Sequence, residues 1–439
     1  MAASVTPMVS VIMTIYNGEI YAAETVQSVL DQSFGDFEFI IVDDGSTDST
    51  LAILSGFRDE RIRLIKLPEN HHIAFAYNTA FRLVRGKYIA IIDSGDVWYP
   101  RKLEKQLDYL RSHPEHAGCF TWTDLIDRQG NDVNDVLKEV RDVFNCQTAT
   151  REEWLRYFFF KGNRLCNPSS LISADAAREV GEHSLFYIKA FDFEWWVRFT
   201  CKFSFGVLEE PLLGFRREET GDGVSVSTPM QITHVRFYNE WMHVRYHMFE
   251  YMDPELFIRT FGEHFRCRDS RTPEELACEQ AFLLTESFGG SRGYSAAGLI
   301  KLEELMSDPV TAELLRNKYQ FGTKDAGAMT GTHIYYDRIA QQRIHRVEEL
   351  EEALRMIKDK EASTGDLLLK EKERNSELKI RIRELEDALK EEHDANLERE
   401  KLIAELNQSI SDLQNSTIWK ASAPLRGIKD KLSGKKKQK

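Results

Sequence analysis

The chain has 439 residues, and its 58 lysines and arginines against 71 aspartates and glutamates give a formal net charge of −13. This acidity excludes a protein that binds nucleic acid through bulk positive charge, but it does not exclude a local basic patch. Hydrophobic residues make up 42% and charged residues 29%, which is typical of globular domains with a sizeable core.

The sequence shows no export or membrane-spanning signal. No apolar run approaches the roughly 18–20 residues that a membrane-spanning helix needs. The start of the chain carries no basic segment before its apolar stretch, so we expect no secretion signal. The six cysteines are scattered without a C-x-x-C pair, which argues against a disulfide framework or a structural zinc site and favours a reducing compartment.

Strand and helix patterns alternate in the first part of the chain. The apolar runs predict strands at Val9–Thr14, Phe37–Val42, Ile62–Leu67 and Tyr88–Ile92. Helical spacing predicts helices at Tyr21–Gln32, Thr47–Ser55 and Ile73–Val84. This alternation predicts an α/β fold with a doubly wound, mostly parallel sheet, which binds its ligands beyond the carboxyl ends of the strands.

The composition changes along the rest of the chain. Residues 145–229 are mixed and rich in aromatic side chains, and helices dominate residues 231–331 without a chemical role that we can assign. From Val347 to Leu413 an unbroken heptad register predicts a long coiled coil, and a single solvated helix is the alternative. Gly365 lies in a weak stretch where we expect a break, and Asn375 and Asn396 at a positions favour a parallel dimer.

The last twenty residues hold eight lysines or arginines and one aspartate. Apolar residues such as Trp419 and Ile428 interleave with them, so this segment predicts an element that lies on an anionic membrane surface. The alternative is a disordered solubilising tail. We therefore divide the chain into an α/β domain at residues 8–228, a helical extension at 229–340, a coiled coil at 341–414 and a basic amphipathic tail at 415–439.

Two acidic turns directly follow predicted strands. Asp43-Asp44-Gly45-Ser46 follows the second strand, and Asp93-Ser94-Gly95-Asp96 follows the fourth. Carboxylates at such positions can accept hydrogen bonds from a nucleotide or hold a divalent metal against a diphosphate. The alternative for either turn alone is capping of the helix that follows.

Three blocks together resemble the family-2 glycosyltransferases, which have the GT-A nucleotide-sugar-binding fold. The blocks are VSVIMTIYN, SVLDQSFGDFEFIIVDDGSTDST and ENHHIAFAYNTAFRLVRGKYIAIIDSGDVWYPRKLEKQL. The resemblance covers Val9 to Leu107 closely and continues more loosely to Ser227. It implies a GT-A domain at residues 8–228.

The resemblance also implies roles for single residues. It implies that Thr14, Tyr16, Asp43 and Asp44 hold the nucleotide, with Asp44 as the contact to the base and Asp43 as its support. Asn78 and Asp93 would complete the donor site. A divalent metal, Mn²⁺ or Mg²⁺, would be bound by Asp96 with Asp93.

The stretch from Phe191 to Arg198 resembles the block that carries the family's catalytic base, which makes Asp192 that base. The residues agree, because a carboxylate among Phe191, Phe193 and two tryptophans would be desolvated, and desolvation raises its pKa and improves it as a proton acceptor. The alternative is a structural ion pair of Asp192 with Arg198 or Lys189.

Three positions depart from the family pattern. The chain has Gly95 where the family usually has a metal-binding aspartate, Tyr77 where it has an arginine, and His72 where it has a glycine. Either Asp93 and Asp96 take over the metal, or the metal is dispensable.

The function that the resemblance implies is inverting transfer of a sugar from a nucleotide-sugar donor to a hydroxyl of a glycan or lipid-linked acceptor in surface-polysaccharide biosynthesis. The predicted coiled coil implies a homodimer, and the basic tail implies peripheral attachment to the cytoplasmic face of the inner membrane. The alternative is a catalytically degenerate scaffold that organises partner enzymes through its coiled coil.

Overall fold

The computed structural model describes residues 6–217, 231–286, 295–331, 346, 350, 352–356 and 372–415, without the side chains of 231–235, 372–378, 407 and 409–415. The chain divides into two compact units, Met1–His333 and Ile334–Lys439. No described helix is long and apolar enough to cross a membrane.

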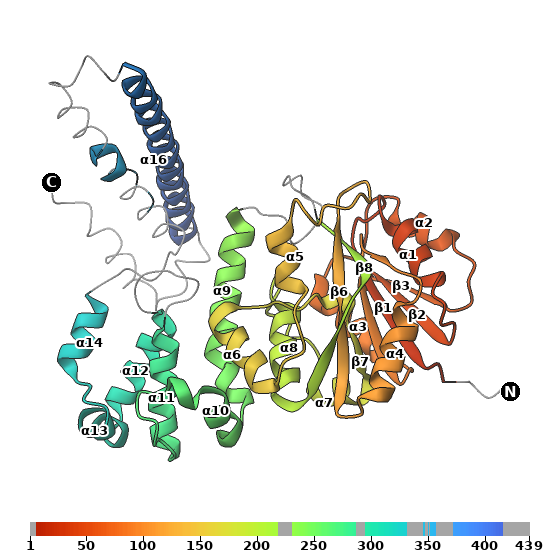
Figure 1. The fold of residues 1–439 in the computed structure, drawn as a ribbon, viewed down its shortest axis with the longest axis horizontal. Helices are drawn as coiled ribbons and strands as arrows, with labels where there is room; N and C mark the ends of the chain where they lie inside the picture. Colours follow the sequence, from red (N-terminus) through yellow and green to blue (C-terminus); the bar gives the residue numbers. More distant parts are fainter. Residues whose placement is uncertain are drawn as a thin grey trace. The chain divides into compact units, whose positions relative to one another are not determined.

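In the described part of the first unit, eight strands form one sheet in the order β3-β2-β1-β4-β7-β6-β8-β5 (Figure 1). The strands are β1 (Val9–Ile15), β2 (Phe37–Asp43), β3 (Ile62–Lys66), β4 (Tyr88–Asp93), β5 (Val97–Trp98), β6 (His116–Ile126), β7 (Leu171–Ser173) and β8 (Ser204–Arg216). The four strands predicted from the sequence are therefore all present, with ends that differ by one residue.

The prediction of a mostly parallel sheet is confirmed, because six of its eight strands run in the same direction and only β7 and β5 run against them. β3, β2, β1 and β4 are parallel to one another. β7 is antiparallel to both β4 and β6, and β5 is antiparallel to β8, so the whole sheet is mixed. Of the predicted strands, β1, β2 and β4 are mainly apolar and buried on both faces, whereas β3 at the edge of the sheet is only half-buried.

Helices cover both faces of the sheet (Figure 1). One apolar cluster joins β1 and β2 to α1 (Ala22–Leu30), α2 (Thr50–Gly56) and α4 (Lys102–Ser112). Alternate residues of the same strands pack in a second cluster with α3 (Ile73–Arg82), α6 (Arg151–Lys161), α7 (Ala174–Val180) and α8 (Phe191–Lys202). This alternation follows from the period of two along a strand. A short helix, α5 (Lys138–Phe144), follows β6.

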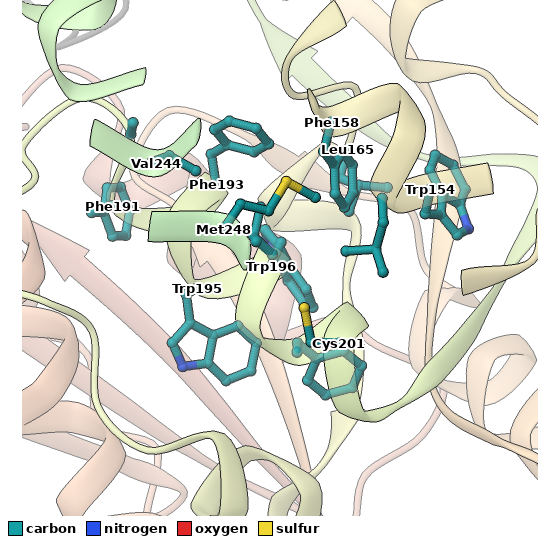
Figure 2. Close-up of a cluster of buried hydrophobic side chains, with 14 of the residues drawn as sticks. Trp154, Phe158, Leu165, Phe191, Phe193, Trp195, Trp196, Cys201, Val244 and Met248 are labelled. Carbon is teal, nitrogen blue, oxygen red and sulfur yellow. The ribbon is translucent and has the colours of Figure 1, made fainter. Parts of the chain in front are cut away.

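The second cluster continues into the helices beyond the sheet. α9 (Gln231–Met248), α10 (Pro254–Phe261) and α11 (Pro273–Thr285) contribute buried side chains to it. Figure 2 shows Val244 and Met248 of α9 beside Phe193 and Trp196 of α8. A smaller core joins α11 to α12 (Ala296–Ser307), α13 (Pro309–Asn317) and α14 (Thr323–Thr330).

In the second unit, α16 (Lys372–Asn415) is the long helix. Leu350, Leu354 and Leu385 form a buried cluster, against which Ile382 and Leu389 pack. All five occupy a or d positions of the predicted heptads, so part of the predicted seam closes within one chain. A coiled coil between two chains stays a prediction. The break at Gly365 and residues 416–439 of the predicted tail lie outside the described residues.

Candidate active site

A cavity of about 500 Å³ lies at the carboxyl ends of β1 and β4. Because β2 and β3 extend the sheet from one side of β1 while β4 lies on the other, the strand order reverses here, where open α/β sheets bind ligands. Six of the residues selected from the sequence line this cavity: Thr14, Tyr16, Asp44, Asp93, Asp96 and Asp192.

The first acidic turn is tied to the loop that follows β1. The Asn17 side chain accepts a hydrogen bond from the Thr47 backbone N–H at 2.8 Å, and the Asn17 N–H donates to Ser46 Oγ at 2.9 Å. Asp44 is buried at the cavity wall, where Oδ1 accepts from the His71 N–H at 2.9 Å. Burial raises the pKa of the Asp44 carboxyl. Two loops from different strands therefore hold this acceptor in place.

A glycine is needed within this turn. Gly45 has a φ of +72°, a backbone conformation that side chains rarely adopt. A Cβ at this position would lie 2.5 Å from the backbone of Glu69, so the chain passes too closely for any other residue.

The second acidic turn is braced from two sides. Tyr77 Oη donates a 2.6 Å hydrogen bond to Asp93 Oδ1, and the Arg216 N–H donates to Asp96 Oδ1 at 2.9 Å. The Arg216 Nε also donates to the Gly95 carbonyl at 2.6 Å. Asp96 Oδ2 is buried and has no hydrogen-bond partner among the described residues, and burial raises the pKa of this carboxyl well above its usual range.

Gly95 has a φ of +112°, so this turn uses a conformation open mainly to glycine. An aspartate at position 95 would be strained there, although the nearest atom to an added Cβ is 3.7 Å away on Tyr21. The backbone conformation of the turn therefore explains why this chain has glycine, and not aspartate, at position 95.

Asp192 is the second residue of α8 and faces the same cavity. Its Oδ1 accepts from the Phe193 N–H at 2.7 Å, and Asn163 Nδ2 lies 3.5 Å from Oδ2. Burial raises the pKa of Asp192 to about 7, Asp93 adds to this rise, and the Lys189 ammonium opposes it. A carboxyl with this pKa can accept a proton near neutral pH.

The alternative ion pair with Arg198 does not form. Arg198 instead pairs with Glu194, with Nε 2.7 Å from Oε1. Lys189 remains an electrostatic neighbour of Asp192 at the cavity wall.

Two of the selected residues do not line the cavity. Asn78 is buried, and its side chain exchanges two 2.8 Å hydrogen bonds with the backbone of His183. The structure therefore places Asn78 in a link between α3 and the segment before α8. Asp43 is fully buried and accepts from the Ser46 N–H at 3.1 Å, as a support within the turn.

Comparison with known proteins identifies the family. Residues 10–177 match the family described as Glycosyl transferase family 2. Over 215 residues the chain is 32% identical to an uncharacterized glycosyltransferase of Methanocaldococcus jannaschii, which covers 48% of this chain and 71% of that protein. The chain belongs to glycosyltransferase family 2.

This glycosyltransferase has further similarities. It is 37% identical over 103 residues to the UDP-Glc:alpha-D-GlcNAc-diphosphoundecaprenol beta-1,3-glucosyltransferase WfgD of Escherichia coli, a match that covers 24% of this chain and 41% of that protein. The crystal structure of S. aureus TarS 1-349 in complex with UDP aligns at 16% identity with a TM-score of 0.45, covering 75% of this chain and 94% of that chain.

Lys189 and Arg217 of this glycosyltransferase line the cavity, as does Arg216, which braces the second acidic turn. The Arg217 guanidinium lies 4.0 Å from the centre of the Phe215 ring and 5.7 Å from that of Phe144. Its Nε is buried without a hydrogen-bond partner among the described residues. Burial lowers the pKa of Arg217, and the nearby acidic residues of the cavity oppose this change. The site thus combines carboxylates with a cation fixed by aromatic contacts.

GT-A enzymes often use a divalent metal. No group of three or more histidine, cysteine, aspartate or glutamate side chains suited to a metal occurs within the described ranges. Mg²⁺, however, is often held by one or two carboxylates plus phosphate oxygens. The orphaned Oδ2 of Asp96, beside Asp93, fits this arrangement.

Sequence reasoning missed Arg217 and the contact from Tyr77 to Asp93. The only signal for Arg217 is its place directly after the last strand, next to Arg216. From the sequence, Tyr77 is only a position where the family's arginine is missing. In the structure Tyr77 is fully buried, and its hydroxyl donates a hydrogen bond to one oxygen of Asp93.

Proposed function

We propose that this glycosyltransferase moves a sugar from a nucleoside-diphosphate sugar to an acceptor hydroxyl, with inversion at the anomeric carbon and Asp192 as the general base. One observation carries this proposal. A carboxyl with a pKa raised to about 7 faces the same cavity as the two acidic turns that follow β2 and β4.

The donor end of the proposed site is built from the loops after β1 and β2. We assign Asp44 to accept a hydrogen bond from the nucleobase, with Thr14 and the half-exposed ring of Tyr16 at its sides. Arg217 would face the diphosphate, and its fixed charge would take the place of the arginine that the family has at Tyr77. A divalent metal, when bound by Asp96 and Asp93, would supply further charge to the leaving diphosphate.

In the proposed reaction Asp192 accepts the proton that the acceptor hydroxyl loses. The acceptor oxygen forms a bond to the anomeric carbon while the bond from that carbon to the diphosphate breaks. The acceptor proton moves to an Asp192 oxygen, and the nucleoside diphosphate leaves with the bonding pair. Arg217 stabilises the negative charge that develops on the leaving oxygens.

For the acceptor we propose a lipid-linked glycan in surface-polysaccharide assembly. The E. coli relative, whose name specifies a diphosphoundecaprenol-linked acceptor, supports this choice. The match to this relative spans 41% of its length.

The function is tested by thermal shift and calorimetry with UDP-, GDP- and dTDP-sugars, with and without Mn²⁺. We expect one nucleotide class to raise the Tm and Mn²⁺ to strengthen its binding. Asp44→Ala should weaken nucleotide affinity by about 10-fold, the effect of losing one hydrogen bond that the nucleobase donates to a charged acceptor. Unchanged affinity in Asp44→Ala would refute its role. If no sugar nucleotide binds the wild-type protein, the scaffold becomes the better account.

We also propose that the C-terminal unit dimerises this enzyme and that residues 415–439 attach it to anionic membranes. Ile403 and Leu406, at a and d positions of α16, are exposed, which supports a partner for this part of the seam. The charge and apolar residues of the tail support a membrane surface.

Ending the chain at residue 340 separates these roles from donor binding. We expect the shortened protein to be a monomer by light scattering, to lose binding to vesicles that contain anionic lipid at low salt, and to keep its nucleotide affinity. The cavity that we propose to bind the nucleotide is lined by residues of the first compact unit alone, which supports this expectation. If the shortened protein stays dimeric, the dimer interface lies outside the C-terminal unit. If the full-length protein does not bind anionic vesicles at low salt, the basic tail is a solubilising segment and not a membrane anchor.

A further inference from the structure

Glu240 of α9 is a buried carboxylate that, among the described residues, is hydrogen-bonded by backbone N–H groups of another segment. Its side chain is 6% exposed. Oε1 accepts from the Ile188 N–H at 3.0 Å, and Oε2 accepts from the N–H groups of Lys189 and Ala190, both at 2.7 Å. Three consecutive backbone donors thus converge on one side chain, which is a strong anion-binding geometry.

These three donors lead directly into α8. Ala190 is the residue that caps α8, and it provides no side-chain hydrogen bond to the helix start. Serine, threonine, asparagine or aspartate usually serves there, because the first N–H groups of a helix lack partners within it. The negative charge of Glu240 lies beside this helix start, where the helix dipole favours an anion. Glu240 therefore fixes the segment that leads into α8 up to its capping residue, which has no polar side chain of its own.

The same segment forms a wall of the cavity. Ile188 and Lys189 line it, and Asp192 follows Ala190 by two residues. Movement of residues 188–190 would therefore shift both the proposed base and the lysine that tunes its proton affinity.

α9 is itself anchored, so it can act as a support. Trp241, Val244 and Met248 of this helix are buried in the same cluster as Phe193 and Trp196 of α8 (Figure 2). All of α9 lies beyond the matched family segment, which ends at residue 177.

We propose that Glu240 is a positioning residue that holds Asp192 in place through the backbone of residues 188–190. This inference rests on the proposed role of Asp192 as the base. It gives the helical extension a function that the sequence did not reveal, because its first helix completes the proposed catalytic end of the cavity.

The test replaces Glu240 in the full-length enzyme. Glu240→Gln keeps the size of the side chain but puts an NH₂ group where one oxygen accepts a backbone N–H. Glu240→Asp keeps the charge but shortens the reach. We measure hydrolysis of the donor identified in the nucleotide screen, together with the Kd of its nucleoside diphosphate.

We expect kcat of Glu240→Gln to fall by about 10-fold or more, since displacements near 1 Å can cost up to about 10²-fold in rate. The nucleotide Kd should change less than twofold, because the nucleotide contacts come from β1, β2 and their loops. The kcat of Glu240→Asp should lie between that of the wild type and that of Glu240→Gln.

Glu279 of α11 supplies a matched control. It is also buried and accepts from the backbone N–H groups of Arg266 and Cys267, at 2.7 and 2.9 Å, but it does not line the cavity. We expect Glu279→Gln to lower the Tm to a similar extent and to leave kcat within twofold of the wild type.

Two results would overturn the inference. One is a kcat of Glu240→Gln, or of Glu240→Asp where the glutamine variant does not fold, within twofold of the wild type. The other is an equal loss of kcat in Glu279→Gln, which would reduce the effect to general destabilisation. Failure of the proposed function itself looks different, since the wild-type enzyme would then neither bind nor hydrolyse any sugar nucleotide.

Discussion

Replacing Asp192 by asparagine is expected to lower the rate of transfer, or of donor hydrolysis to water, by about 10²-fold or more. The amide cannot accept the proton of the attacking hydroxyl, yet its oxygen can still accept the hydrogen bond from the Phe193 N–H that Asp192 Oδ1 accepts in the native chain. Donor binding should stay nearly intact, because the base acts on the acceptor. Steady-state kinetics and calorimetry on the same preparation separate the two effects.

The pH dependence provides a second check on Asp192. Because its pKa is raised to about 7, kcat/KM should fall about tenfold per pH unit well below pH 7 and level off above it. Lys189 lowers this pKa while it is charged, so Lys189→Met should move the acid limb of the profile to higher pH.

The thermal stability of Asp192→Asn supplies the control for its loss of activity. The charged form of a buried carboxyl with a raised pKa is disfavoured in the folded protein, so ionisation of Asp192 costs stability as the pH rises towards 7. Asp192→Asn should therefore unfold at the same or a higher temperature than the wild type at pH 8. Near-normal turnover by this variant, or a pH profile without an acid limb near 7, would contradict the assignment.

Replacing Arg217 by glutamine is expected to weaken binding of the nucleoside diphosphate by about 10- to 100-fold. A hydrogen bond that involves a charged group contributes about 1.5–3 kcal/mol, and each 1.4 kcal/mol is a factor of ten in affinity. The affinity for the nucleoside without phosphates should hardly change, because Asp44 and the loop after β1 remain. Calorimetry with the two ligands measures the difference directly.

Arg259 on α10 offers a control that changes the net charge equally. It pairs with Glu152 at 3.1 Å on the surface and does not line the cavity. Arg259→Gln should leave both affinities unchanged. Equal losses of nucleoside and nucleoside-diphosphate affinity in Arg217→Gln would mean that Arg217 shapes the cavity without contacting the diphosphate.

Local pattern was enough for the first four strands of the sheet and for much of the candidate site. The strands Val9–Ile15 and Phe37–Asp43 are buried along their whole length and mainly apolar, because helices cover both of their faces. Strand ends then place Asp44 and Asp93 at one edge of the sheet, since parallel strands share their carboxyl ends. The aromatic setting of Asp192 likewise indicated a raised pKa, as burial in the structure gives it.

Only the tertiary structure decided which distant residues meet at that edge. The pairing of β7 with β4 and β6 depends on contacts between remote segments, for which no local periodicity exists. The same holds for Asn78 with His183, for Tyr77 with Asp93, and for the arrival of Arg217 from the end of β8. Glu240 is the clearest case, because its partners are backbone N–H groups about fifty residues away. Every residue except proline has a backbone N–H, so the sequence cannot indicate which of these groups will bind a distant carboxylate. The sequence by itself thus determined the strands, the acidic turns and a desolvated carboxylate, whereas packing determined how they are braced into one cavity.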